Sequence, residues 1–103
     1  MARSIWVSPR ALQDVADLAV YLGRTNATAA SNFLDAFDRL CDVISQSPEI
    51  GSPVRFANSR LDGLRVLRLS AFPNHLVFYL PGGESIQVVR VLHGSRDLDA
   101  IFE

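Results

Sequence analysis

The sequence HLVFYL at residues 75–80, followed by PGGE at 81–84 and SIQVVRVLH at 85–93, decides the fold of this chain. Both apolar runs have the length of a strand and are rich in residues that favour strands. Two strands joined by a short turn that contains Gly-Gly form a β-hairpin. Because side chains alternate between the faces of a strand, we expect one apolar face that packs against the helices, made of Leu76, Phe78, Leu80, Ile86, Val88 and Leu92.

The opposite face of this hairpin mixes polar and apolar side chains. Such a face is typical of a surface that becomes covered when a partner binds. By alternation it carries His75, Val77, Tyr79, Gln87, Val89, Val91 and His93.

The segments on either side extend the pattern. Residues 64–69 predict a further strand, and residues 70–74, which include Pro73, predict a connection to the hairpin. Gly51-Ser52-Pro53 predicts a turn. After the hairpin, residues 97–102 predict a final helical turn.

Amphipathic helices are expected before these strands. Ser8 is a favoured N-cap and Pro9 suits the first helical position, so a helix should follow a short strand at residues 3–7 and stop near Gly23. A second helix should begin after the N-cap Asn26 and end before Pro48. Because the connection between the helices is very short, they should form an antiparallel hairpin.

This order of elements predicts an α+β fold. It comprises an N-terminal strand, an antiparallel helical hairpin on one sheet face, a three-strand antiparallel meander and a short C-terminal helical turn. The length predicts one domain over residues 1–103.

Composition excludes several classes of site. The single cysteine, Cys41, lies in an apolar helical pattern and is predicted to be a core residue rather than a nucleophile. His75 and His93 do not make a metal-site signature, so neither a metal nor a cofactor is expected. The sequence shows no signal peptide and no run near the ~20 apolar residues that span a bilayer, so we expect a cytoplasmic protein without membrane contact.

The charges are nearly balanced, with a net charge of −1, and every basic residue apart from the histidines is Arg. A balanced charge argues against direct, sequence-specific DNA binding. Arg is suited to bidentate contacts with carboxylate or phosphate. A GC-rich coding bias is the alternative explanation for the lack of Lys.

Several segments carry a likeness to a known family: GLRVLRL at 63–69, HLVFY at 75–79 and IQVVRVLHGSRD at 86–97, of which residues 90–97 are the most specific. Residues 48–51 lie where that family has a Pro and a Gly. Over nearly its whole length the chain resembles toxins of the RelE/ParE superfamily, more closely the ParE branch. The resemblance to the opening helix of these toxins rests on Ala11, Asp14, Leu18, Tyr21 and Leu22.

This resemblance implies a RelE/ParE-like fold and the toxin half of a bacterial type II toxin–antitoxin pair. ParE-type members inhibit DNA gyrase, whereas RelE-type members cut mRNA in the ribosomal A site. Both are neutralised by an antitoxin that wraps the toxin. The fold does not select between these activities, so the choice depends on residues.

The residues favour gyrase inhibition. RNA cleavage needs a base, an acid and stabilising cations, and the nuclease branch often adds a Tyr near the C-terminus. This chain has no Lys, and Phe102 stands where that Tyr is expected. The alternatives are a metal-independent, ribosome-dependent endoribonuclease that uses Arg65, His93 and Arg96, and a non-toxic module that only binds the antitoxin.

The predicted toxicity residues, which would contact the target, have structural alternatives. His93 could cap a turn, Arg96 and Asp97 could pair with each other or with a helix end, and Tyr79 could belong to the core. Arg90 is predicted to form a structural ion pair, because alternation turns it toward the helices and a buried Arg needs a carboxylate. The full set of predicted toxicity residues is Arg65, Tyr79, His93, Arg96 and Asp97.

The partner implied by the resemblance is a cognate antitoxin. We expect it to cover the helical hairpin and an exposed sheet edge, using an amphipathic helix and an added strand. The predicted antitoxin-binding residues are Leu18, Tyr21, Leu22, Phe33 and Phe37.

Overall fold

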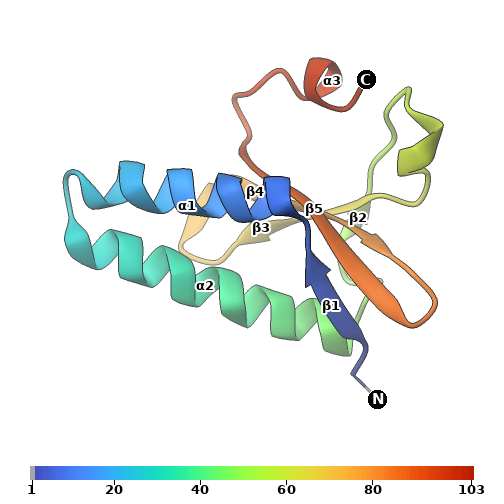
Figure 1. Ribbon diagram of the computed structural model, residues 1–103, viewed down its shortest axis with the longest axis horizontal. Helices are drawn as coiled ribbons and strands as arrows, with labels where there is room; N and C mark the ends of the chain where they lie inside the picture. The colour runs from blue at the N-terminus through green and yellow to red at the C-terminus, as the bar shows by residue number, and fades with distance from the viewer. Residues whose placement is uncertain (1) are drawn as a thin grey trace.

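The computed structural model describes residues 2–103 and confirms the predicted α+β class. Over this range the strands form one sheet in the order β1-β5-β4-β3-β2, and α1 and α2 lie side by side and antiparallel (Figure 1). In chain order the elements are β1 (Ser4–Val7), α1 (Pro9–Gly23), α2 (Ala27–Gln46), β2 (Ser52–Pro53), the 3-10 helix η1 (Ser59–Leu61), β3 (Arg65–Leu69), β4 (Phe72–Pro81), β5 (Ser85–His93) and α3 (Leu98–Ile101).

The two long helices begin at the N-caps that the sequence predicts. The Ser8 hydroxyl accepts a hydrogen bond from the N–H of Ala11, with Pro9 in the first turn. The Asn26 side chain accepts from the N–H groups of Thr28 and Ala29. These bonds satisfy N–H groups that have no partner inside the helix, and so they fix where each helix starts.

Helix α1 completes the edge of β5. β1 runs parallel to β5 and pairs with it only as far as Val88. Beyond this point Ser8 donates its N–H to the carbonyl of Val88 and its hydroxyl to the carbonyl of Val89. The Asp14 carboxylate then accepts the N–H of Val91 at 3.0 Å. Groups from the helix and its cap therefore take the place of a longer β1.

The same carboxylate forms an ion pair with Arg90. Its two oxygens accept from Nε at 2.7 Å and from Nη2 at 3.0 Å. The Asp14 and Arg90 side chains are only 8% and 13% exposed. Three N–H donors thus compensate the carboxylate for the water it loses on burial. Asp14 is the carboxylate partner that Arg90 was expected to need.

The prediction of which sheet face meets the helices is wrong in part. Ile86 and Val88 do face the helices, but Leu92 faces away from them. Phe78 pairs with Arg90 and Tyr79 pairs with Val88, so Val89 is an extra residue in β5. Such a bulge exchanges the two faces for the rest of the strand. On β4 the faces are the reverse of the prediction: Val77 and Tyr79 join the helix-side core, whereas Leu76, Phe78 and Leu80 lie on the other face.

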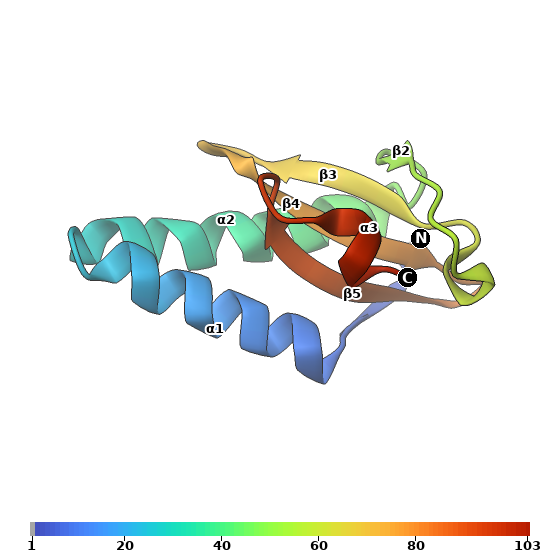
Figure 2. The same cartoon turned by 90° about the horizontal axis from the view of Figure 1, so that it is seen from above.

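That other face is covered by the chain itself, not left open as the sequence suggested. Phe102 stacks on Phe56 with ring centroids 4.6 Å apart and lies 4.8 Å from Phe78. Leu98 and Ile101 of α3 pack into the same cluster. Figure 2 shows α3 lying over the sheet. The C-terminal segment therefore closes a second small core.

Two predicted boundaries also change. Residues 52–53, predicted as a turn, form β2, which pairs with Val66 and Arg65 of β3. Strand β4 begins at Phe72, so Pro73 lies inside a strand rather than in a connection. The turn before it is tight, with Ala71 at a φ of 66°.

Tyr79 ties the segment after α2 to the sheet. Its ring is fully buried, and its hydroxyl donates to the carbonyl of Pro48 and accepts the N–H of Gly51, both at 2.8 Å. Burial raises the pKa of this hydroxyl, so it keeps its proton at neutral pH. The Arg65 guanidinium donates to the carbonyls of Glu49 and Gly51 at 3.1 and 2.6 Å. A Cβ at Gly51 would lie 2.6 Å from the Tyr79 hydroxyl, so glycine is needed there.

We expect Asp14→Asn to lower the free energy of unfolding by about 3–5 kcal/mol, because it leaves Arg90 as a buried, unpaired charge. Urea unfolding followed by circular dichroism measures this value. Asp38→Asn, on the exposed side of α2, is the control and should change it by less than about 0.5 kcal/mol. Equal effects of the two substitutions would contradict the structural role of the pair.

Tyr79→Phe should cost about 1–3 kcal/mol, because the Gly51 N–H and the Pro48 carbonyl both lose their partner in a buried place. The matched control is Tyr21→Phe, since the Tyr21 side chain is exposed and its loss of a hydroxyl should be nearly neutral. The same unfolding measurement compares them, and a neutral Tyr79→Phe would show that the hydroxyl does not hold this segment.

Candidate functional site

The predicted toxicity residues do not form one cluster. Arg65 pairs with Tyr79 on β4, whereas His93 pairs with His75 near the opposite end of that strand. The four-residue offset between His75 and Tyr79 corresponds to about 13 Å along the strand. In addition, β4 lies between β3 and β5. Arg65, engaged with the carbonyls of Glu49 and Gly51, is therefore not part of a site with His93.

Three predicted contact residues are buried. Tyr79 and Phe33 have no exposed surface, and Phe37 is 6% exposed. In this structure these three side chains belong to the core, so the contacts predicted for Tyr79, Phe33 and Phe37 stay predictions. An apolar stripe on a helix or strand has the same pattern whether the protein's own core or a partner covers it.

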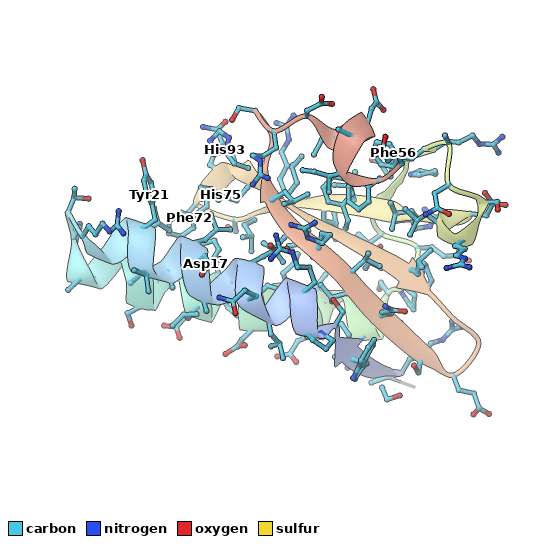
Figure 3. The ribbon with its side chains drawn as sticks, turned by 45° about the horizontal axis from the view of Figure 1, so that its top comes forward. Asp17, Tyr21, Phe56, Phe72, His75 and His93 are labelled. Carbon is cyan, nitrogen blue, oxygen red and sulfur yellow. The ribbon has the colours of Figure 1, made fainter. Side chains whose placement is uncertain are left out.

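A groove lies between the second half of α1 and the end of β5. We call it the α1–β5 groove. Its wider part is a pocket of about 510 Å³, and a neighbouring hollow that shares Asp17, Leu18 and His93 extends it toward Arg10 and Arg96. Figure 3 shows Tyr21, Phe72, His75 and His93 gathered beside α1, with Phe56 apart from them, next to α3. The residues that line the wider part are Asp17, Leu18, Tyr21, His75, His93 and Ser95.

Two histidines that line this pocket contact each other. Their rings meet edge to face with centroids 5.2 Å apart, and His75 also contacts Phe33 and Phe72. The Nδ1 atom of His75 is buried and has no hydrogen-bond partner among residues 2–103. Burial, and secondarily His93, lower the pKa of His75, so its ring is neutral at pH 7. The His75 side chain is half-buried.

His93 caps the turn that follows β5, one of the two roles considered for it. Its Nδ1 accepts the N–H of Ser95 at 3.0 Å. In a neutral ring this bond leaves the proton on Nε2, which is then a hydrogen-bond donor. His93 therefore has one nitrogen held by the backbone and one left for a ligand.

Arg96 and Asp97 differ in their surroundings. The Asp97 side chain accepts the N–H of Ala100 and so caps α3. Arg96 is exposed and lines the narrow end of the α1–β5 groove. Within residues 2–103 its side chain makes no ion pair. Of the two, Arg96 is the one available to a binding partner.

The chemistry available in the groove is limited. Two imidazoles in contact and a nearby guanidinium could move a proton and hold an anion. The part of the chain that the structure describes holds no cluster of three metal-ligating side chains. Cys41 lies outside the groove on α2, and burial together with Asp38 and Asp42 raises its pKa to about 11, so its thiol is a weak nucleophile.

The sequence matches a family model described as ParE toxin of type II toxin-antitoxin system, parDE, over residues 5–98. The chain belongs to the ParE toxin family. The solved structure described as "Chromosomal ParDE TA system from P. aeruginosa" is similar to it, with a TM-score of 0.72 and 15% sequence identity. The alignment covers 89% of this chain and 96% of that chain, and supports a ParE-like fold. No curated protein matches the sequence.

As a ParE toxin, the chain is the toxin component of a type II toxin–antitoxin system, and such a system implies an antitoxin as partner. The α1–β5 groove of this ParE toxin joins residues from two predicted sets: Leu18 and Tyr21 were assigned to the antitoxin, and His93 and Arg96 to the target. Leu22, one turn beyond Leu18, packs against the helix-side core.

Asp17 and Arg10 also line this groove, although neither was predicted from the sequence. Asp17 and Tyr21 are four residues apart on α1 and so share one side of the helix, which is a signal present in the sequence. Their closeness to His75 depends on how α1 packs on the sheet, and no local pattern encodes that.

None of the helices within residues 2–103 has the length and hydrophobicity of a membrane-spanning segment.

The lowered pKa of His75 predicts that this ParE toxin loses stability as the pH falls below about 6.5. The unfolded chain takes up the proton first, so the contribution of neutral His75 is complete above about pH 6.5 and disappears as the pH falls through the folded-state pKa. His75→Phe keeps an aromatic ring but cannot titrate, so its free energy of unfolding should vary less with pH. Urea unfolding between pH 7.5 and 5 tests this, and identical slopes for both proteins would reject it.

Proposed function

We propose that this chain inhibits DNA gyrase by binding to it in the cytoplasm, and that its antitoxin neutralises it. One observation favours binding over catalysis: the candidate catalytic residues do not lie together. Arg65 lies about 13 Å further along the sheet than His93 and holds loop carbonyls. A cation that stabilises a reacting phosphate has to lie within hydrogen-bond reach of it, together with the acid and the base.

The C-terminal segment supports the same proposal. Phe102, at the position where a nuclease would be expected to carry Tyr, is 3% exposed and packs between Phe56 and Phe78. The Phe102 ring contributes to packing, and because it has no hydroxyl it cannot supply a proton. In the endoribonuclease alternative, His93 would supply the acid or the base and Arg96 the cation, because both line the groove.

The antitoxin is proposed to use two surfaces. One is the helical hairpin, where Tyr21 is exposed and Leu18 is half-buried. The other is the outer edge of β3, because β2 pairs only with Arg65 and Val66 within the described chain. Residues 67–69 can then accept an added strand, with a hollow beside it that is lined by Ser52, Val66, Leu67, Arg68 and Leu76.

Purified, antitoxin-free protein should inhibit DNA supercoiling by gyrase in a gel assay. Arg96→Ala should weaken inhibition by about tenfold, the effect of losing one important interface side chain. Arg60→Ala is the control, since Arg60 is also exposed but lies on η1. Unaltered supercoiling at a large molar excess of the wild-type chain would reject gyrase as the target.

Two further measurements separate the alternatives. Primer extension on translated mRNA should show no codon-phased cuts after induction, and cuts that disappear in His93→Gln would favour the endoribonuclease. Expression without the antitoxin should arrest growth, and normal growth would favour a non-toxic antitoxin-binding module.

A further inference from the structure

Trp6 is a large apolar side chain that the rest of the chain leaves uncovered. It is 52% exposed and belongs to neither of the two hydrophobic clusters within residues 2–103. Its neighbours Ile5 and Val7 pack against the helix-side core, so alternation places Trp6 on the opposite face of β1. Trp is enriched in binding surfaces because its ring buries a large area. The exposed ring therefore marks β1 as a contact surface.

The backbone of β1 is also open along its outer edge. β1 is the last strand of the sheet and pairs only with β5. The Ser8 N–H bonds to β5, whereas the Arg3 N–H points the other way and bonds to the carbonyl of Ser45 on α2. Because backbone groups alternate between the two edges of a strand, the N–H and C=O groups of Ile5 and Val7 point outward, like those of Arg3. Among residues 2–103 these outward groups of Ile5 and Val7 have no partner.

An antiparallel second copy of β1 satisfies all of these groups. With a two-fold axis at Trp6, Ile5 of one copy lies opposite Val7 of the other, and each such pair exchanges two N–H···O=C hydrogen bonds. The two Trp6 residues lie between these pairs and form a non-hydrogen-bonded pair. In such a pair the side chains share one face and lie closest, with Cβ atoms about 4.5–5.5 Å apart. The two indole rings then cover each other.

We propose that two copies of this chain pair through β1 and form a dimer with one continuous sheet. An interface with two-fold symmetry must be self-complementary. The outward residues of β1 are symmetric about Trp6, and Ser4–Val7 contains no charged side chain, so two copies meet without repulsion. This inference is independent of the proposed function.

The contact between α2 and β1 leaves room for this pairing. The Ser45 carbonyl and hydroxyl bond to the backbone of Arg3, before the residues that pair. The two-fold axis at Trp6 therefore places the two copies of α2 at opposite ends of the paired strands. The pocket of the α1–β5 groove stays open, because its lining comes from the second half of α1 and from the far ends of β4 and β5.

The other open edge of the sheet suits a second copy less well. On β3 the residues beyond the pairing with β2 are 67–69. A two-fold pairing of these residues would centre on the exposed Arg68 and place two guanidinium groups directly opposite each other. Like charges in this position are destabilising. A second copy is therefore expected at β1 and not at β3.

Trp6 is the only Trp of the chain, so its fluorescence reports this contact. The emission of the purified, antitoxin-free chain should shift to shorter wavelength as its concentration rises, in step with the dimer fraction measured by analytical ultracentrifugation. Because the paired strands are short, we expect a dissociation constant of about 1–100 μM. A chain that stays monomeric at about 500 μM would overturn the proposal.

Trp6→Ser should raise the dissociation constant of the dimer by at least about tenfold, because the central aromatic pair is lost. Val20→Ser is its matched control, since Val20 is also an exposed apolar residue but lies on α1. Its dissociation constant should stay within about twofold of the wild type. Unfolding curves establish that both variants are folded. A dimer that Trp6→Ser leaves unchanged uses another surface, and the proposal fails.

A disulfide tests the register of the two strands. In a Cys41→Ser background, Trp6→Cys should give a covalent dimer on mild oxidation, because Cα atoms of a non-hydrogen-bonded pair lie about 4.5 Å apart, within reach of a disulfide. Ser4→Cys is the control on the same strand face. The predicted register places the two Ser4 residues about 13 Å apart along the strands, which is too far to link.

Two outcomes would reassign this edge. Equal linkage of Ser4→Cys and Trp6→Cys would exclude the pairing centred on Trp6. A monomeric chain whose Trp6 emission shifts only when the antitoxin is added would assign the edge to a strand of the antitoxin, and would overturn the dimer.

Discussion

The Asp14 carboxylate holds α1 against the edge of β5, and the position of the candidate site depends on it. It accepts two hydrogen bonds from Arg90 and one from the N–H of Val91. Both residues lie beyond Val88, where the pairing of β1 with β5 ends. Asp17, Leu18 and Tyr21 follow on the same helix. Because α1 is rigid over these turns, anchoring Asp14 also sets where these three side chains stand relative to His75 and His93.

The bulge at Val89 decides what the other wall of the groove contains. It changes the face on which the later residues of β5 lie, so Val91 enters the helix-side core while Leu92 packs on the face covered by α3. His93 then lies opposite His75, where the two rings touch. The groove thus combines a helix anchored by one ion pair with a strand end whose orientation is set by one inserted residue.

Much of this site was present in the sequence as separate parts. Leu18, Tyr21, His93 and Arg96 were all singled out, but for two different partners, and the structure brings them into one groove. Phe33, Phe37 and Tyr79 were assigned to surfaces although they belong to the core. Periodicity identifies the apolar side of an element, but the depth at which a residue lies depends on what packs over it.

The sequence by itself determined the features that depend on near neighbours. The caps at Ser8 and Asn26, the turn at 81–84 and the strand at 85–93 follow from hydrogen bonds and backbone preferences within a few residues. Tertiary structure alone decided the contacts between distant segments. Arg90 meets Asp14 from 76 residues away, and Tyr79 meets Pro48 from 31. The choice of sheet face, the closure by Phe102 and the groove all depend on such long-range packing, because local propensity carries no information about which distant group will fill a given space.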